Sequence, residues 1–232
     1  MEDHSLKPDF KYKHDNPYHD RLEQFNDFVL RDNESEIHKG NWNKEIFKRD
    51  GKLFLEIGSG AGHFMMDYCE HHPDHNFVGL DYRFKRSFQL AKKLAKIENR
   101  NFRYLRAKGE RIEYIFDENE LDGLFYFFPD PWPKTRQQKK RLLQVPFLEA
   151  AYKTLRPGAI FYIKTDHDGY AEWMKEEIQK FGKFEVLLES KNLRVEYPEH
   201  FLCKYVTGFE KIFIEQGVNI KAFILKSNKE EK

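Results

Sequence analysis

The stretch LFLEIGSGAG, residues 53–62, decides the fold class of this chain. An apolar strand pattern runs into a turn with glycine at three alternate positions, and a helix pattern follows. Glycine leaves the backbone bare, so a ligand can approach the turn closely at the end of the strand. The stretch therefore predicts a strand, turn and helix that together hold a nucleotide-like ligand.

Short apolar strands alternate with helix-length amphipathic segments from Lys52 onward. This alternation is typical of β and α units around a mainly parallel sheet. It predicts an α/β, doubly wound sheet of seven strands, at residues 53–57, 77–80, 102–105, 123–128, 159–163, 184–188 and 220–225. Helical spacing of apolar residues predicts core-facing helices over 84–95 and 143–155, the second of them divided at Pro146.

The ends of the chain are predicted to lie outside this domain of residues 51–226. Residues 1–18 are polar and aperiodic and are expected to form a flexible N-terminal arm. Residues 19–50 contain apolar positions from Leu22 to Leu30 and are expected to form a helical lead-in. Residues 227–232 are expected to be a polar tail.

Composition excludes several classes of protein. The 232 residues include 40 Lys and Arg against 39 Asp and Glu, which excludes a globally basic nucleic-acid coat and a polyanionic tail protein. Hydrophobic residues make up 40%, enough for one core and too many for a disordered chain. The chain lacks a membrane-length apolar run and a secretory signal pattern, so we expect a soluble, cytoplasmic protein.

Cysteine and histidine usage predicts neither a disulfide framework nor a metal site. Cys69 and Cys203 are too few and too isolated for either. The histidines of residues 71–75 flank Pro73 and are expected to form a solvated turn.

Two carboxylates indicate which nucleotide-like ligand the glycine turn accepts. The dinucleotide fingerprint G-x-G-x-x-G points helix amides at a pyrophosphate, but here Glu56 stands two residues before Gly58, and glycine recurs at Gly60. Glu56 would repel a pyrophosphate and suits a ligand with a positive end, such as S-adenosylmethionine. Asp81 ends the next strand, 23 residues after Gly58, where an acid accepts hydrogen bonds from ribose hydroxyls. NAD, or a plain glycine turn without a ligand, is the alternative.

The stretch PDPWPK, residues 129–134, stops a buried strand abruptly, because proline cannot join a central ladder. In a doubly wound sheet the end of this fourth strand lies beside the glycine turn, so Asp130 is delivered to the ligand crevice on a stiff loop. Residues 134–141 then contain five lysines and arginines, and residues 82–97 contain six. Neither stretch contains an aspartate or glutamate. These two basic strips are either phosphate contacts or solvated helix faces.

At this point the chain resembles the tRNA (guanine-N7-)-methyltransferases. The matching motifs are EIGSG (56–60), PDPWPK (129–134), KTD (164–166) and TGFE (207–210), within residues 53–213. The resemblance implies a class I methyltransferase fold, S-adenosylmethionine as cofactor, and methylation of the guanosine at position 46 in the variable loop of tRNA. It implies cofactor contacts at Glu56, Gly58, Gly60, Asp81, Tyr82, Lys108, Glu110 and Asp130. It implies substrate contacts at Lys134, Arg136, Lys139, Lys140, Asp166, Thr207, Gly208, Phe209 and Glu210.

The chain departs from the family pattern in three places. Gln137 replaces a histidine in the basic run, and Phe209 and Ile212 replace a tyrosine and a lysine in the late motif. Lys108-Gly109 stand where the family commonly has Asp-Ala beside the adenine. The first two departures bear on tRNA contacts and the third on the adenine contact.

The chemistry of guanine N7 indicates how such a site would work. N7 has a lone pair and no proton, so its methylation needs placement more than a general base. The product purine is positively charged, and Asp130 is the candidate catalytic carboxylate that stabilises it. Lys134 and Asp166 would lie on the substrate side of the same crevice.

Other interpretations remain open from the sequence. The protein could be an exocyclic-amine methyltransferase, although residues 130–132 contain one proline where that loop needs two, or a non-catalytic RNA-binding protein with the same fold. Asp130 could be a turn residue, Asp166 a helix N-cap and Glu210 a surface residue.

Overall fold

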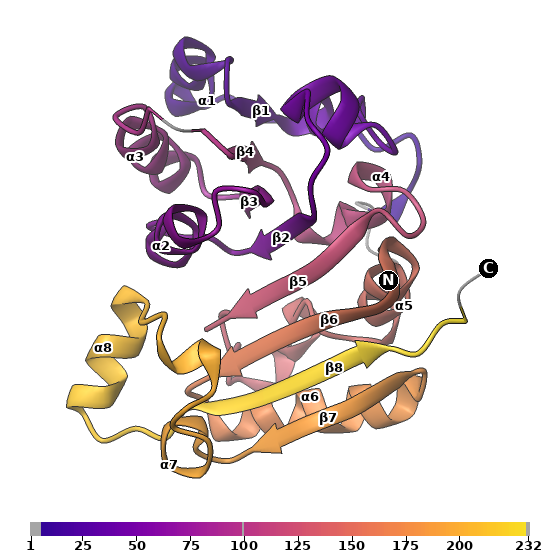
Figure 1. The fold of residues 1–232 in the computed structure, drawn as a ribbon, viewed down its shortest axis with the longest axis vertical. Coiled ribbons are helices and arrows are strands. Elements are labelled where there is room, and N and C mark those ends of the chain that lie inside the picture. Colours follow the sequence, from indigo (N-terminus) through magenta and orange to yellow (C-terminus); the bar gives the residue numbers. More distant parts are fainter. Residues whose placement is uncertain (1–5, 99, 231–232) are drawn as a thin grey trace.

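The protein forms one eight-stranded sheet with helices on both faces (Figure 1). The structure is a computed structural model and describes residues 6–98 and 100–230. The strand order is β1-β4-β3-β2-β5-β6-β8-β7, and β8 alone runs antiparallel to its neighbours. The strands are β1 (Val29–Arg31), β2 (Leu53–Ile57), β3 (Asn76–Asp81), β4 (Phe102–Arg106), β5 (Leu121–Phe127), β6 (Leu155–Thr165), β7 (Phe184–Ser190) and β8 (Lys221–Ser227). The predicted doubly wound α/β class is confirmed.

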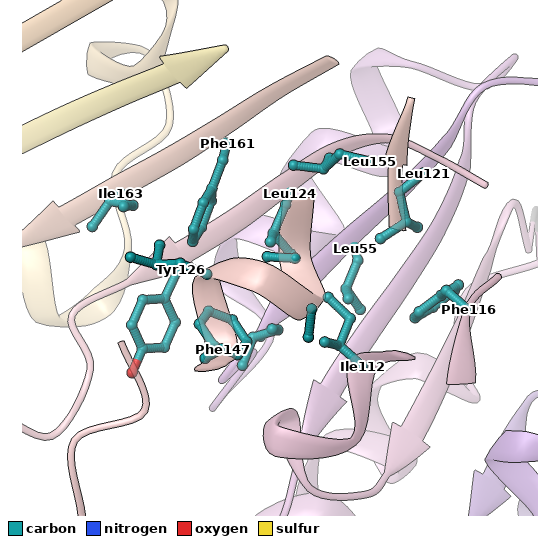
Figure 2. Packing of buried hydrophobic residues seen from close by; sticks show 14 of the residues in the cluster. Leu55, Ile112, Phe116, Leu121, Leu124, Tyr126, Phe147, Leu155, Phe161 and Ile163 are labelled. Atoms are coloured by element: carbon teal, nitrogen blue, oxygen red, sulfur yellow. The ribbon is translucent and has the colours of Figure 1, made fainter. Parts of the chain in front are cut away.

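The helices form two layers, because alternate side chains of each strand point to opposite faces of the sheet. Leu55 packs with the residues of α4, α5 and α6, whereas its neighbour Phe54 packs with those of α2 and α3. Figure 2 shows Leu55, Leu124 and Phe161 near Phe147 of α5 in the first of these layers. The helices are α2 (His63–His71), α3 (Phe84–Leu94), α4 (Ile112–Ile115), α5 (Val145–Thr154), α6 (Asp168–Phe181), α7 (Leu193–Glu196) and α8 (Gly208–Glu215). Pro146 lies in the first turn of α5, as its missing amide hydrogen requires.

The prediction of seven strands and a helical lead-in is wrong at one point. Residues 29–31 form β1, which pairs parallel with β4 and places Leu30 opposite Leu105. Three residues are too few to show strand alternation, so Val29 and Leu30 were grouped with the helical pattern before them. The rest of the lead-in is short: α1 (Pro17–Arg21), the 3-10 turns η2 (Leu22–Phe25) and η3 (Asp32–Glu36), and the π-helical turn η4 (Trp42–Phe47).

The described part of the predicted arm packs against the domain. The Lys108 amide donates to the Tyr12 hydroxyl at 3.0 Å, and the Tyr114 hydroxyl donates to the Leu6 carbonyl at 2.7 Å. At the other end, Ser227 belongs to β8, and Lys229 Nζ donates to the Lys153 carbonyl. These contacts are long-range, so composition did not reveal them. Residues 1–5, 231 and 232, which belong to the predicted arm and tail, lie outside the described residues.

Every helix in the described residues is too short or too polar to cross a membrane.

Candidate functional site

A crevice opens at the carboxyl ends of the central strands, where doubly wound sheets bind ligands. Strands β3 and β4 lie on one side of β2, and β5 lies on the other side. The strand order therefore reverses direction between β2 and β5, which pair with each other at this topological switch point. Two hollows of about 440 and 490 Å³ lie there. We call the first the ribose hollow, after the ribose that the sequence predicts beside Asp81, and the second the α8 hollow, after the residues of α8 (Gly208–Glu215) that line it. Both are lined by Gly58, by Arg83 and Arg86, and by residues 127–130, so they meet along these residues, which include Asp130.

The glycine turn has a conformation that requires glycine. Gly58, Gly60 and Gly62 have φ values of 82°, 56° and 75°, in the region that other residues rarely adopt. A side chain at Gly58 would meet no atom within 4 Å, whereas one at Gly62 would strike Leu90. Gly58 therefore presents bare backbone to open space, as a close ligand contact requires.

Glu56 is the buried acid of the site. It is 3% exposed, and its Oε2 atom has no hydrogen-bond partner among the described residues. Burial raises the pKa of the Glu56 carboxyl to about 8, and the nearby Asp81 carboxylate adds to the rise. Because the side chain lines the α8 hollow, it offers an unpaired oxygen to a cationic ligand there.

Asp81 lies at the end of β3 and lines the ribose hollow. Its Oδ2 accepts from the Gly60 amide at 3.1 Å and its Oδ1 accepts from the Arg83 amide at 2.9 Å. Two backbone amides thus fix the carboxylate, and the remaining lone pairs can accept from a ligand.

The ribose hollow also contains three of the cofactor contacts that the resemblance implies. Tyr82, Lys108 and Glu110 all line it. The guanidinium of Arg106, whose side chain is fully buried, lies over the Tyr82 ring at 4.4 Å from its centre and supports it. Tyr12, which accepts from the Lys108 amide, supports the same wall. Sequence reasoning missed Arg106 and Tyr12, because no local motif marks them.

Asp130 follows the end of β5, at the junction of the two hollows. The loop is tight, since Phe128 and Trp132 have φ values of 50° and 44°. The Asp130 side chain is 55% exposed and pairs with the guanidinium of Arg83. The carboxylate is therefore accessible and held beside the glycine turn.

The basic run after Asp130 forms the 3-10 helix η6 (Thr135–Lys140). Lys134, Arg136, Lys139 and Lys140 are exposed, and of these only Lys140 is among the described residues that line the ribose hollow. Arg141 differs, because it is 3% exposed and its Nε donates to the Pro131 carbonyl at 2.9 Å. Arg141 thus supports the Asp130 loop and is unavailable to a phosphate.

The late motif separates into two environments. Asp166, Thr207, Gly208 and Phe209 line the α8 hollow. Glu210 does not join them: its side chain is fully buried and paired with Lys164 and Arg194. The interpretation of Glu210 as a surface residue is therefore wrong, and so is that of Asp166 as an N-cap, since His167 caps α6.

Comparison with known proteins identifies methyltransferases as the relatives of this chain. A family model described as "Putative methyltransferase" matches residues 50–223. A tRNA (guanine-N(7)-)-methyltransferase of Exiguobacterium sp. is 36% identical over 172 residues, which are 70% of this chain and 79% of that protein. A bifunctional glycosyltransferase/methyltransferase of Fusobacterium nucleatum is 30% identical over 88% of this chain, which spans only 33% of that longer protein.

The solved structures support the fold. An antibiotic-related methyltransferase superposes with a TM-score of 0.57 at 18% identity, covering 79% of this chain and 90% of that one. At this identity the likeness concerns the arrangement of the sheet and its helices.

Proposed function

Because the chain belongs to the tRNA (guanine-N(7)-)-methyltransferase family, we propose that it transfers a methyl group from S-adenosylmethionine to N7 of a guanosine in tRNA. We further assign the target to the variable loop, at position 46, and the protein to the cytoplasm. The observation that carries the proposal is the meeting of the ribose hollow and the α8 hollow at Asp130. A carboxylate there lies between a place for the cofactor and a place for the base.

The residues of the ribose hollow and the glycine turn fit the cofactor. Asp81 would accept hydrogen bonds from the ribose hydroxyls, and Tyr82, Lys108 and Glu110 would surround the adenine. Gly58 and Gly60 would allow close backbone approach, and the unpaired Oε2 of Glu56 would face the positive methionyl end. When bound, S-adenosylmethionine supplies an electrophilic methyl group on its sulfonium.

The residues around the junction would orient guanine and stabilise its charge. N7 has no proton to lose, so none of these side chains must act as a general base. Asp130 would stabilise the positive charge that develops on the purine and would accept its N1 or N2 hydrogens. Asp166, Thr207, Gly208 and Phe209 would surround the base, while Lys134, Arg136, Lys139 and Lys140 would contact phosphates of the tRNA.

The proposed function is tested with purified protein, unmodified tRNA and S-adenosylmethionine. We expect 7-methylguanosine as the methylated nucleoside by mass spectrometry, and strand cleavage at the variable loop after treatment that opens 7-methylguanosine. A tRNA in which adenosine replaces the target guanosine is the control and should remain unmethylated. Methylation of an exocyclic amine, or none at all, would contradict the proposal.

Glu56 should make cofactor binding depend on pH. In the free protein, with a pKa of about 8, most Glu56 carboxyls are protonated at pH 7, whereas a cationic ligand requires the ionised form. Binding should therefore release close to one proton at pH 7, and affinity should rise by up to about tenfold per pH unit from 6 to 8. Calorimetry in two buffers of different ionisation enthalpy measures this release.

Glu56→Gln is the control for that experiment. It should bind the cofactor weakly and without proton release, because the amide cannot ionise. If the wild-type affinity is the same at pH 6 and pH 8, Glu56 does not bind the cation.

Binding of tRNA should be strongly salt-dependent through the exposed part of the basic run. Replacing Lys139 and Lys140 with alanine should flatten the slope of log affinity against log salt by roughly 1.5 to 2 units, if each contacts one phosphate. Lys180→Ala/Lys183→Ala removes the same charge from exposed positions near the opposite end of the sheet and should leave the slope unchanged. Equal slopes in both double variants would assign η6 to a solvated face.

A further inference from the structure

A buried ion network beside the α8 hollow connects β6, α7, α8 and the loop before α8. Lys164 Nζ donates to Glu210 Oε2 at 2.6 Å and to the Tyr205 carbonyl at 3.3 Å. Arg194 Nη2 donates to Glu210 Oε1 at 2.7 Å. The Lys164 and Glu210 side chains are fully buried, and that of Arg194 is 25% exposed. One carboxylate thus accepts from two cations that lie on β6 and α7.

The partners of this network lie next to the residues of the α8 hollow. Lys164 is two residues before Asp166, and its ammonium lies 4.5 Å from the centre of the Phe127 ring at the end of β5. Glu210 directly follows Thr207, Gly208 and Phe209 in the chain. The network therefore joins α8, which lines one side of the hollow, to the carboxyl ends of β5 and β6.

Helix α8 has few other contacts with the domain: the Phe213 ring lies 5.6 Å from that of Phe128, and the Gly208 amide donates to His63 Nδ1 at 3.2 Å. Glu210 is the only buried residue among the eight of this helix. Three of its large apolar side chains are exposed, with Phe209 51%, Ile212 47% and Ile214 42% exposed, while Phe213 is half-buried beside the ring of Phe128. Most surface helices are held by an apolar face packed on the core, and α8 has no such buried face. Its one fully buried attachment is the Glu210 carboxylate.

We propose that Glu210 is a positioning residue that makes no contact with the RNA. It fixes α8 to the end of β6 through Lys164 and to α7 through Arg194, so that Thr207 and Phe209 form the wall of the α8 hollow. Removing one partner of a buried ion pair strongly destabilises the folded protein, because the other charge is left buried and unpaired. Replacing both charges with uncharged side chains often changes the stability little. This asymmetry separates a positioning role from direct binding. This inference rests on the proposed function only in the part of the test that measures methylation of tRNA.

The test compares Glu210→Gln with Lys164→Met/Glu210→Gln. Glu210→Gln leaves the Lys164 ammonium without its carboxylate, so amides of α8 in the RNA-free protein should exchange with deuterium at least about tenfold faster. Methylation of saturating tRNA should fall by a similar factor. The double variant removes the stranded charge, and both properties should return most of the way to wild type. Glu215→Gln removes an exposed charge from the same helix and should change neither.

Direct RNA binding by Glu210 predicts the opposite pattern. Wild-type exchange rates for α8 in Glu210→Gln, or a double variant that methylates no better than Glu210→Gln, would overturn the proposal. If Glu210→Gln does not fold, Arg194→Met provides the same test, because it breaks one arm of the network at a partly exposed side chain. Unchanged α8 exchange in Arg194→Met would likewise overturn it. Exchange requires no substrate, so a wild type inactive on tRNA would refute the proposed function and leave this test intact.

Discussion

Asp130→Asn is expected to lower the rate of methyl transfer to bound tRNA by roughly two to three powers of ten. The substitution keeps the shape of the side chain but removes the anion that stabilises the charge developing on the purine. Cofactor affinity should change much less, because Glu56 and Asp81 lie on other strands. Single-turnover rates at saturating tRNA, from pH 6 to 9, measure the effect without a contribution from binding.

The ion pair between Asp130 and Arg83 requires its own control. Arg83→Met breaks the same pair and leaves the carboxylate, so its single-turnover rate should stay well above that of Asp130→Asn. Wild type should also lack a steep rise of rate with pH, because N7 has no proton to remove. A fast Asp130→Asn variant would make Asp130 a turn residue. A steep pH dependence would point to a target atom other than N7.

Asp81→Ala is expected to weaken S-adenosylmethionine binding by at least tenfold and by up to several hundredfold. Each charge-assisted hydrogen bond to a ribose hydroxyl contributes roughly 1.5–3 kcal/mol, and 1.4 kcal/mol corresponds to a factor of ten. Calorimetric titration of the variant measures the loss.

Asp81 also accepts from the amides of Gly60 and Arg83, so its removal loosens the glycine turn. A cofactor analogue without the ribose hydroxyls separates the two effects. For that analogue the substitution should cost only the part due to the loosened turn. An equal loss for both ligands would show that Asp81 acts on the turn alone, and an unchanged affinity for S-adenosylmethionine would exclude both roles.

The resemblance to tRNA (guanine-N7-)-methyltransferases, stated from four short motifs, is confirmed by the family match and the relatives. Three of these motifs lie at the carboxyl ends of strands. A residue that follows a buried strand of a parallel sheet is placed at the same edge as the residues that follow its neighbours. For this reason the linear sequence was enough to bring Glu56, Asp81, Asp130 and Asp166 to one crevice.

The sequence misled where a residue's partner lies far along the chain. Arg141 was grouped with the exposed cations of its run, yet it is buried against the Pro131 carbonyl and the ring of Tyr170. The short strand β1 exists because β4 offers it an edge more than 70 residues later. In each case the partner lies outside the local segment: the Pro131 loop and Tyr170 of α6 for Arg141, and β4 for β1.

The sequence by itself determined seven of the eight strands, the glycine turn and the place of Asp130, because apolar periodicity, glycine and proline act on neighbouring residues. For charged residues that do not follow the end of a strand, only the tertiary structure decided which of them face the crevice. Glu210 is separated from Phe209 by one peptide bond, but a helix points successive side chains in different directions. Glu210 meets Lys164, 46 residues away, inside the protein, while Phe209 lines the α8 hollow. A buried charge must find an opposite charge, and that partner can lie anywhere in the chain.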